Sequence, residues 1–130
     1  MSGIDARRDQ IKERISDLQY EIKGQNYLKD EFTHSKQKIE TAITSWKQAR
    51  DKYNNIAMAE VEVTSYFEGS AAKRTKEKVT NTMQEIEKLC TYQESLLAGV
   101  TDQIKVIGDY IFRMESEILS LQQELVSLAE

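Results

Sequence analysis

Apolar residues recur every seven positions along most of this chain, and that period constrains the fold more than any other feature. In the second half, one column of the repeat contains Val79, Ile86, Gln93, Val100, Ile107, Met114, Leu121 and Leu128. A second column contains Met83, Cys90, Leu97, Ile104, Ile111, Ile118 and Leu125. Two such columns, three and four residues apart, form a continuous seam on one side of a helix. The second half is therefore predicted to be one long helix.

The first half repeats less regularly. One column contains Ile4, Ile11, Leu18, Gln25, Phe32, Ile39, Trp46 and Tyr53. The other column contains Ile15, Ile22, Ile43 and Ala57, but Lys29, Lys36 and Arg50 interrupt it. Small or apolar residues stand one position before the gaps, at Leu28, Ser35, Ala42, Ala49 and Ile56. Because a straight helix drifts against a seven-residue period, we expect the seam to move onto these earlier positions and to include Trp46.

The two seams also locate the reversal between the helices. If the helices pack antiparallel, Ile11 can lie opposite Leu125, and the same register places the midpoint of the hairpin at residue 68. The stretch Phe67-Glu68-Gly69-Ser70 suits a turn. Gly69 tolerates the left-handed backbone conformation that closes a helix, and Ser70 can cap the next one.

The predicted fold is all-α, a long antiparallel two-helix hairpin that resembles a coiled coil and forms a single domain over residues 1–130. Helix one is expected over about residues 4–64, the turn over about 65–70 and helix two over about 71–129. Each helix would be about 90 Å long. Composition agrees, because the chain has no proline and only five glycines, so helix-breaking residues are scarce.

Charge and hydropathy exclude several function classes. A formal net charge of −4 argues against nucleic-acid binding, which needs clustered Lys and Arg. The one basic cluster, Lys73, Arg74, Lys76 and Lys78, is expected to form a solvated first turn of helix two. No stretch approaches the roughly 20 apolar residues of a membrane span, and no apolar signal core follows the charged N-terminus. We therefore expect a cytoplasmic chain without a membrane span.

Residues that could carry catalysis are scarce. His34 is the only histidine and falls on the outer face of helix one, and Cys90, the only cysteine, is expected to be a small core residue. The carboxylates of helix two, from Glu85 to Glu124, are spread along it, whereas a metal site needs carboxylates that converge from several helices. We therefore predict no catalytic residue, no metal site and no cofactor, and a protein that is not an enzyme.

A helix, an aromatic-x-Gly turn followed by small residues, and a second helix together resemble the WXG100 (Esx-like) superfamily of type VII secretion. Here the motif reads Phe67-Glu68-Gly69-Ser70-Ala71-Ala72, with phenylalanine in place of the usual tryptophan. The length and the long first helix look most like the YwqH-like small proteins that accompany LXG-domain toxins in Gram-positive bacteria. The superfamily's Tyr-x-x-x-Asp/Glu export element is missing from the second half of the chain. The resemblance therefore implies an accessory to a toxin, either exported with it or left behind in the cytoplasm.

Apolar residues outside the seam indicate where a partner could bind. Phe112, Leu119 and Val126 recur every seven residues, one position after a seam column, and could extend toward a third helix. The alternative is a broadened seam that long side chains of helix one cover. Tyr20 and Tyr27 form a shorter outward pair on helix one, and tyrosine is common at interfaces.

Two function classes remain. The first is a non-enzymatic partner or targeting chaperone that binds the N-terminal helical region of an LXG-type toxin, alone or with a second small helical protein, and supports its export. The second is a structural coiled-coil module that self-associates or acts as a spacer in an assembly. The sequence leaves open the identity of the partner, the stoichiometry and the formation of a homodimer.

Overall fold

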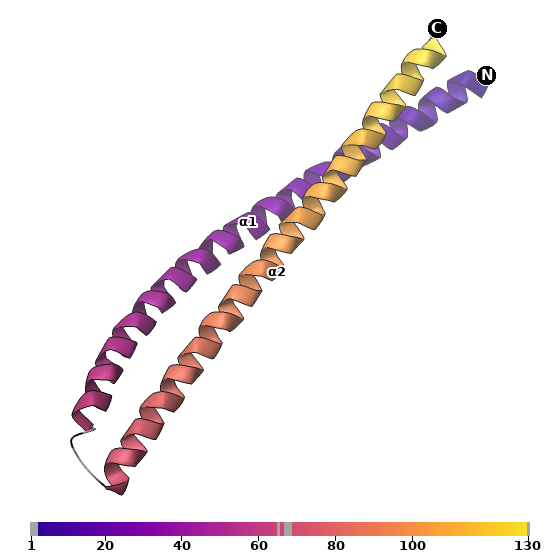
Figure 1. Ribbon diagram of the computed structural model, residues 1–130. Coiled ribbons are helices and arrows are strands. Elements are labelled where there is room, and N and C mark those ends of the chain that lie inside the picture. The colour runs from indigo at the N-terminus through magenta and orange to yellow at the C-terminus, as the bar shows by residue number, and fades with distance from the viewer. Residues whose placement is uncertain (1–2, 65, 67–68, 130) are drawn as a thin grey trace. The chain divides into compact units, whose positions relative to one another are not determined.

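The computed structural model describes residues 3–64, 66 and 69–129, and in this part of the chain it contains two long helices and no strand. Helix α1 spans Gly3–Thr64 and α2 spans Ser70–Ala129. The two helices pack against each other in antiparallel directions (Figure 1). The predicted fold class, an all-α helical hairpin, is confirmed.

The reversal lies where the register of the two seams predicts it, between Thr64 and Ser70. After α1, the backbone N–H of Tyr66 donates to the carbonyl oxygen of Val63 at 3.1 Å. Gly69 has the predicted positive φ, 125°. Its carbonyl oxygen accepts a hydrogen bond from the N–H of Lys73 at 3.2 Å, so Gly69 stands at the N-cap of α2 and does not close α1.

Ser70, predicted as the cap of the second helix, is instead the first residue of α2. Glycine is an accepted N-cap residue, and its freedom at positive φ makes it suited to this sharp entry. Phe67 and Glu68, which belong to the predicted turn motif, lie outside the described residues.

Contacts divide the chain into two compact units, and each is described here by itself. Unit 1 comprises Met1–Ser35 and Val100–Glu130. Its core is a cluster of Leu18, Ile107, Ile111 and Met114, against which Ile22, Phe32, Ile118 and Leu121 pack. Leu18 and Ile11 are the largest fully buried side chains. All these residues belong to the predicted seams, whereas Ile4 near the start of α1 is half exposed.

Ion pairs cross between the helices along one side of the unit 1 seam. Arg7 contacts Glu124 at 2.9 Å and Arg14 contacts Glu117 at 3.1 Å. Hydrogen bonding to Arg7 lowers the pKa of the Glu124 carboxyl below its ordinary value. The stabilisation from this pair is therefore present at neutral pH and lost as the pH falls through that lowered pKa. Both pairs are exposed, so their contribution is small.

Unit 2 comprises Lys36–Gly99. Its buried residues are Ile43, Ala57 and Cys90, which confirms the prediction that the lone cysteine is a core residue. The predicted drift of the α1 seam is wrong. Lys36 and Arg50 remain half-buried in the seam column, and Ala42, Ala49 and Ile56, one position earlier, are exposed.

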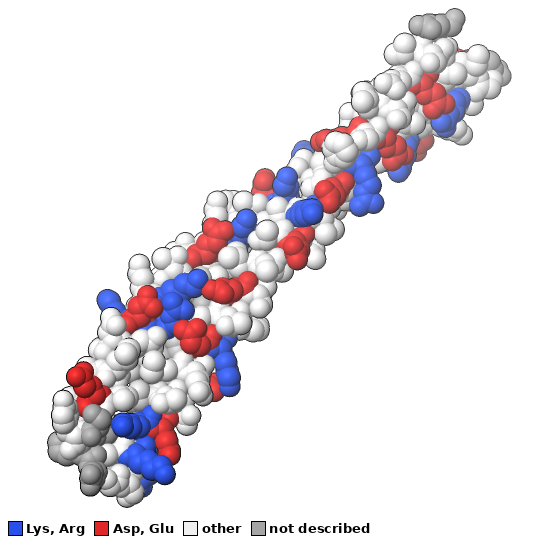
Figure 2. Space-filling model, in the orientation of Figure 1, with Lys and Arg blue, Asp and Glu red and all other residues white. Residues whose placement is uncertain are grey.

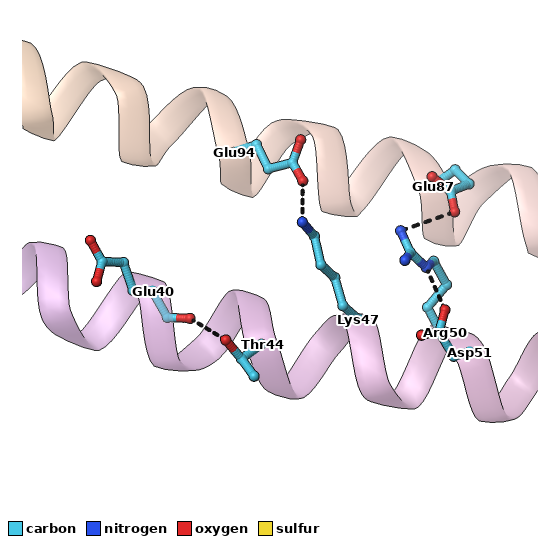
Figure 3. A network of polar contacts seen from close by, with 7 residues as sticks. All are labelled: Glu40, Thr44, Lys47, Arg50, Asp51, Glu87 and Glu94. Carbon is cyan, nitrogen blue, oxygen red and sulfur yellow. Dashed lines mark hydrogen bonds and ion pairs between the residues drawn. The ribbon is translucent and has the colours of Figure 1, made fainter.

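Trp46 also departs from the prediction, because 43% of its surface is exposed. Lys36 and Arg50 can stay in the seam column because their long methylene stems can cover the seam while the charged groups reach its edge. Arg50 does so in unit 2, where its guanidinium contacts Glu87 of α2 at 3.3 Å and Asp51 at 3.2 Å (Figure 3). The α1 seam thus keeps its seven-residue period although some of its positions are not apolar.

The unit 2 seam contains two polar side-chain atoms that are buried without a hydrogen-bond partner, Oδ1 of Asn54 and Oε1 of Gln93. An unsatisfied buried acceptor costs about 1–3 kcal/mol. Gln93→Leu removes the acceptor and adds apolar contact at a seam position, so we expect the free energy of unfolding to rise by about 1 kcal/mol or more. Urea titration followed by circular dichroism measures the change.

Gln84→Leu is the matched control for Gln93→Leu. Gln84 is exposed on α2, so the same substitution there tests helix propensity without burial and is expected to change stability by less than about 0.5 kcal/mol. Equal effects at the two positions would show that residue 93 does not lie in a buried seam.

Candidate partner-binding surfaces

The row Phe112, Leu119 and Val126 lies on the outside of unit 1. Each residue follows a buried or half-buried seam residue of α2 by one position, which turns it about 100° away from the seam. The exposed fractions of the three side chains are 68%, 57% and 61%. The broadened-seam alternative is therefore wrong, because α1 does not cover these side chains. This apolar row faces solvent.

A row of this kind is a suitable site for another helix. Residues seven apart on one helix lie on the same side, so a straight partner helix can contact all three. Each large apolar side chain contributes about 1.5–3 kcal/mol when it becomes fully buried, before the costs of association are subtracted. The row can therefore supply a large share of a binding free energy.

Tyr20 and Tyr27 are exposed on α1, as predicted from the sequence. Tyr20 belongs to an open, shallow hollow on the surface of α1, whose lining is Ser16, Asp17, Tyr20, Glu21, Gly24, Gln25 and Leu28. Gly24 leaves space in this surface, since a Cβ there would have no atom within 4 Å. Tyr20 follows the buried Leu18 by two positions, which places it opposite the seam. The tyrosines and the apolar row thus form two separate surfaces on different helices.

The structure reveals an interhelical bond that the sequence reasoning missed. The hydroxyl of Tyr110 on α2 donates to the carboxylate of Glu21 on α1, and this bond raises the pKa of Tyr110 above its ordinary value. Glu21 and Tyr110 each stand one position before a seam residue, as Arg7, Arg14, Glu117 and Glu124 do. Complementary residue types at these paired positions, in the register already derived, are the signal that could have found the bond.

Unit 2 exposes a second set of large apolar residues that the sequence analysis did not assign to a surface. They are Trp46, Ile56, Met58, Val63, Tyr66, Leu89, Tyr92 and Leu96. Two shallow hollows lie along α1 in this unit, one lined by Ser45, Trp46 and Ala49 and the other by Ile56, Ala59, Glu60 and Val63. These hollows identify a further uncovered surface.

The polar residues of the described part of the chain can be examined for a metal site and for a basic surface. Within residues 3–64, 66 and 69–129, no group of three or more His, Cys, Asp and Glu side chains is placed to hold a metal ion. His34 and the basic cluster from Lys73 to Lys78 are exposed. Figure 2 shows basic and acidic side chains interspersed over the visible face, with uncharged surface between them. Across the described helices, none has a stretch long and apolar enough to span a bilayer.

Comparison with protein-family models, with curated proteins and with solved structures finds no match for this chain.

Proposed function

We propose that this protein is a non-enzymatic helical partner that binds the N-terminal helical region of a type VII-secreted LXG-type toxin and supports its export. The observation that carries the proposal is the row Phe112, Leu119 and Val126, which is apolar, has the period of a helix-packing surface and is exposed. The partner class comes from the resemblance of the stretch from Phe67 to Ala72 to the turn motif of the WXG100 superfamily.

The proposed mechanism is helix addition. The hairpin offers an apolar row on a helix that is already ordered, so binding does not have to fold that element. A toxin helix whose apolar side chains would otherwise be exposed buries them against the row and stays soluble until export. Tyr20 and Tyr27 offer a second surface for another part of the toxin or for a second small helical protein.

A structural coiled-coil module remains the second candidate function. The observation that favours it is the set of exposed apolar residues in unit 2, which self-association would cover. In that case the chain would form assemblies with itself and would not depend on a toxin.

The test is capture of the N-terminal helical region of an LXG-type toxin from cells that co-express it with this chain. The triple variant Phe112→Ser, Leu119→Ser, Val126→Ser is expected to lose capture completely, because it removes the large apolar side chains of the row on which the toxin helix is proposed to dock. The isolated variant should keep its helicity and elution volume, since the three side chains are exposed.

The matched control is Asp102→Ser, Asp109→Ser, Gln123→Ser, which introduces three serines into the same helix at exposed positions. This variant should capture the toxin region as well as the wild type does. Full capture by the row variant with an intact fold would contradict the proposed surface and direct attention to Tyr20 and Tyr27. Absence of capture by the wild-type protein would favour the structural module.

A further inference from the structure

A basic group from α1 lies beside one end of the apolar row on α2. Lys29 is half-buried in the seam column of α1, and its Nζ lies 3.8 Å from the position that a Cβ of Gly108 would occupy. Gly108 precedes Phe112 by four positions, so it lies on the same side of α2 as Phe112, Leu119 and Val126. The ammonium of Lys29 therefore reaches the line of the row at a position that has no side chain.

An equivalent pair in unit 2 shows what Lys29 lacks. Arg50 stands three heptads after Lys29 in the same column of α1, and Glu87 stands three heptads before Gly108 on α2. Arg50 contacts Glu87 at 3.3 Å across the seam (Figure 3). The same register pairs Lys29 with Gly108, and glycine supplies no carboxylate. Lys29 thus has the position of Arg50 in the repeat without its counter-ion.

Other acidic residues do not take the place of that counter-ion. Within residues 3–64, 66 and 69–129, the ammonium of Lys29 has no ion pair and no hydrogen bond, and its nitrogen keeps some contact with solvent. Asp30 and Asp109 directly follow Lys29 and Gly108, so each is turned about 100° away around its helix. Glu115 stands one heptad after Gly108, about 10 Å further along α2.

We propose that the helix that docks on the row Phe112, Leu119 and Val126 has a glutamate or aspartate that pairs with Lys29 beside Gly108. The inference rests on the helix docking proposed above and adds the chemistry of the partner. That partner has apolar residues every seven positions, and its carboxylate stands about one helical turn beyond the residue that contacts Phe112.

Two physical effects favour this partner. A half-buried ammonium has already lost part of its hydration, so it gains from a carboxylate placed beside it. The absence of a side chain at Gly108 lets the partner helix approach α2 closely at that level. Apolar residues every seven positions leave the partner free to shift along the row by a heptad, whereas a single ion pair at one end selects one register.

The probe is a pair of synthetic helical peptides, each with three leucines seven positions apart. One peptide has glutamate four positions before the first leucine and four positions after the last, so that either direction of docking presents a carboxylate to Lys29. The other peptide has glutamine at both places. Wild-type protein should bind the glutamate peptide about fivefold more tightly than the glutamine peptide, measured by fluorescence anisotropy at low salt. This preference should shrink as salt is added.

Lys29→Gln should bind the two peptides with equal affinity, because it removes the ammonium and keeps a polar side chain in the seam. Lys38→Gln is the matched control, since Lys38 is exposed on the same helix. This control should keep the wild-type preference for glutamate. Circular dichroism of both variants should match that of the wild type.

A second pair of variants acts on α2 and does not depend on the Lys29 variant. Gly108→Glu supplies the carboxylate within the chain, as Glu87 does for Arg50, and should abolish the preference for the glutamate peptide. Gly108→Gln adds a side chain of the same size without charge and should keep the preference. Both variants should fold, because a Cβ at this position makes only ordinary contact with the Nζ of Lys29.

Equal affinity of the wild-type protein for the two peptides would overturn the proposal, and so would failure to bind either one. A preference that survives in Lys29→Gln would also overturn it, because another cation such as the exposed Lys105 would then recognise the carboxylate. Capture of the toxin region by a protein without the preference would contradict this inference alone. A preference without toxin capture would instead contradict the toxin as the occupant of the row.

Discussion

Replacement of Leu18 by alanine is expected to lower the free energy of unfolding by about 2–5 kcal/mol. Leu18 is only 1% exposed and belongs to the core cluster of unit 1 with Ile107, Ile111 and Met114. Truncation removes most of a buried side chain and leaves a cavity that the two packed helices cannot close fully. Urea titration followed by circular dichroism measures the loss, and thermal unfolding gives an independent value.

Leu119→Ala is the matched control, because it makes the same chemical change on an exposed residue of the same unit. We expect it to change the free energy of unfolding by less than about 0.5 kcal/mol. A loss as large as that of Leu18→Ala would mean that Leu119 is packed inside the hairpin. Such a result would contradict both the exposed row and the toxin-binding surface proposed for it.

The second large effect is expected at the turn, where Gly69→Val should destabilise the protein by about 1–3 kcal/mol. The φ angle of Gly69 is 125°, a conformation that a β-branched residue adopts only with strain. A Cβ at this position would meet no atom within 4 Å, so the cost comes from the backbone and not from a clash. Chemical unfolding of the variant and the wild type in parallel measures it.

Gly99→Ala should raise the free energy of unfolding, whereas Gly69→Val should lower it. Gly99 lies within α2, and a Cβ there also has open space around it. Alanine is therefore expected to stabilise the protein by about 0.5–1 kcal/mol, because it loses less backbone entropy than glycine when the helix forms.

Equal stability of Gly69→Val and the wild type would show that the backbone at the turn does not require glycine.

The α2 seam could be predicted from the sequence almost residue by residue, because its apolar period continues from Val79 to Leu128 with only Gln93 as a polar member. The period alone also located the reversal to within a few residues, since both helices had to share one register. The α1 seam was harder to predict. From residue type alone, Lys36 and Arg50 were predicted to lie outside the seam. Their methylene stems instead pack in the seam, and the guanidinium of Arg50 forms an ion pair with Glu87.

Of the candidate surfaces, too, one could be predicted from the sequence and another could not. The row Phe112, Leu119 and Val126 could be found because it repeats at a fixed distance from a regular seam. The exposed apolar residues of unit 2 were not predicted as a surface because two of those on α1, Trp46 and Ile56, were interpreted as part of a seam that had drifted. The structure is needed to show that the ion pair between Lys47 and Glu94 covers one flank of the unit 2 seam and leaves the other flank uncovered.

Because Cys90 is buried, its reaction with a thiol reagent can report when the unit 2 seam opens. It is the only cysteine in the sequence, and its side chain is 3% exposed in the unit 2 seam. A thiol reagent can therefore modify the protein at one atom only, and only while α1 and α2 are apart at that level. The rate of modification, compared with that of a free thiol, gives the fraction of time for which this seam is open, and no substitution is needed. If the chain self-associates through unit 2, a rise in protein concentration should slow the reaction, because the seam around Cys90 is then held closed.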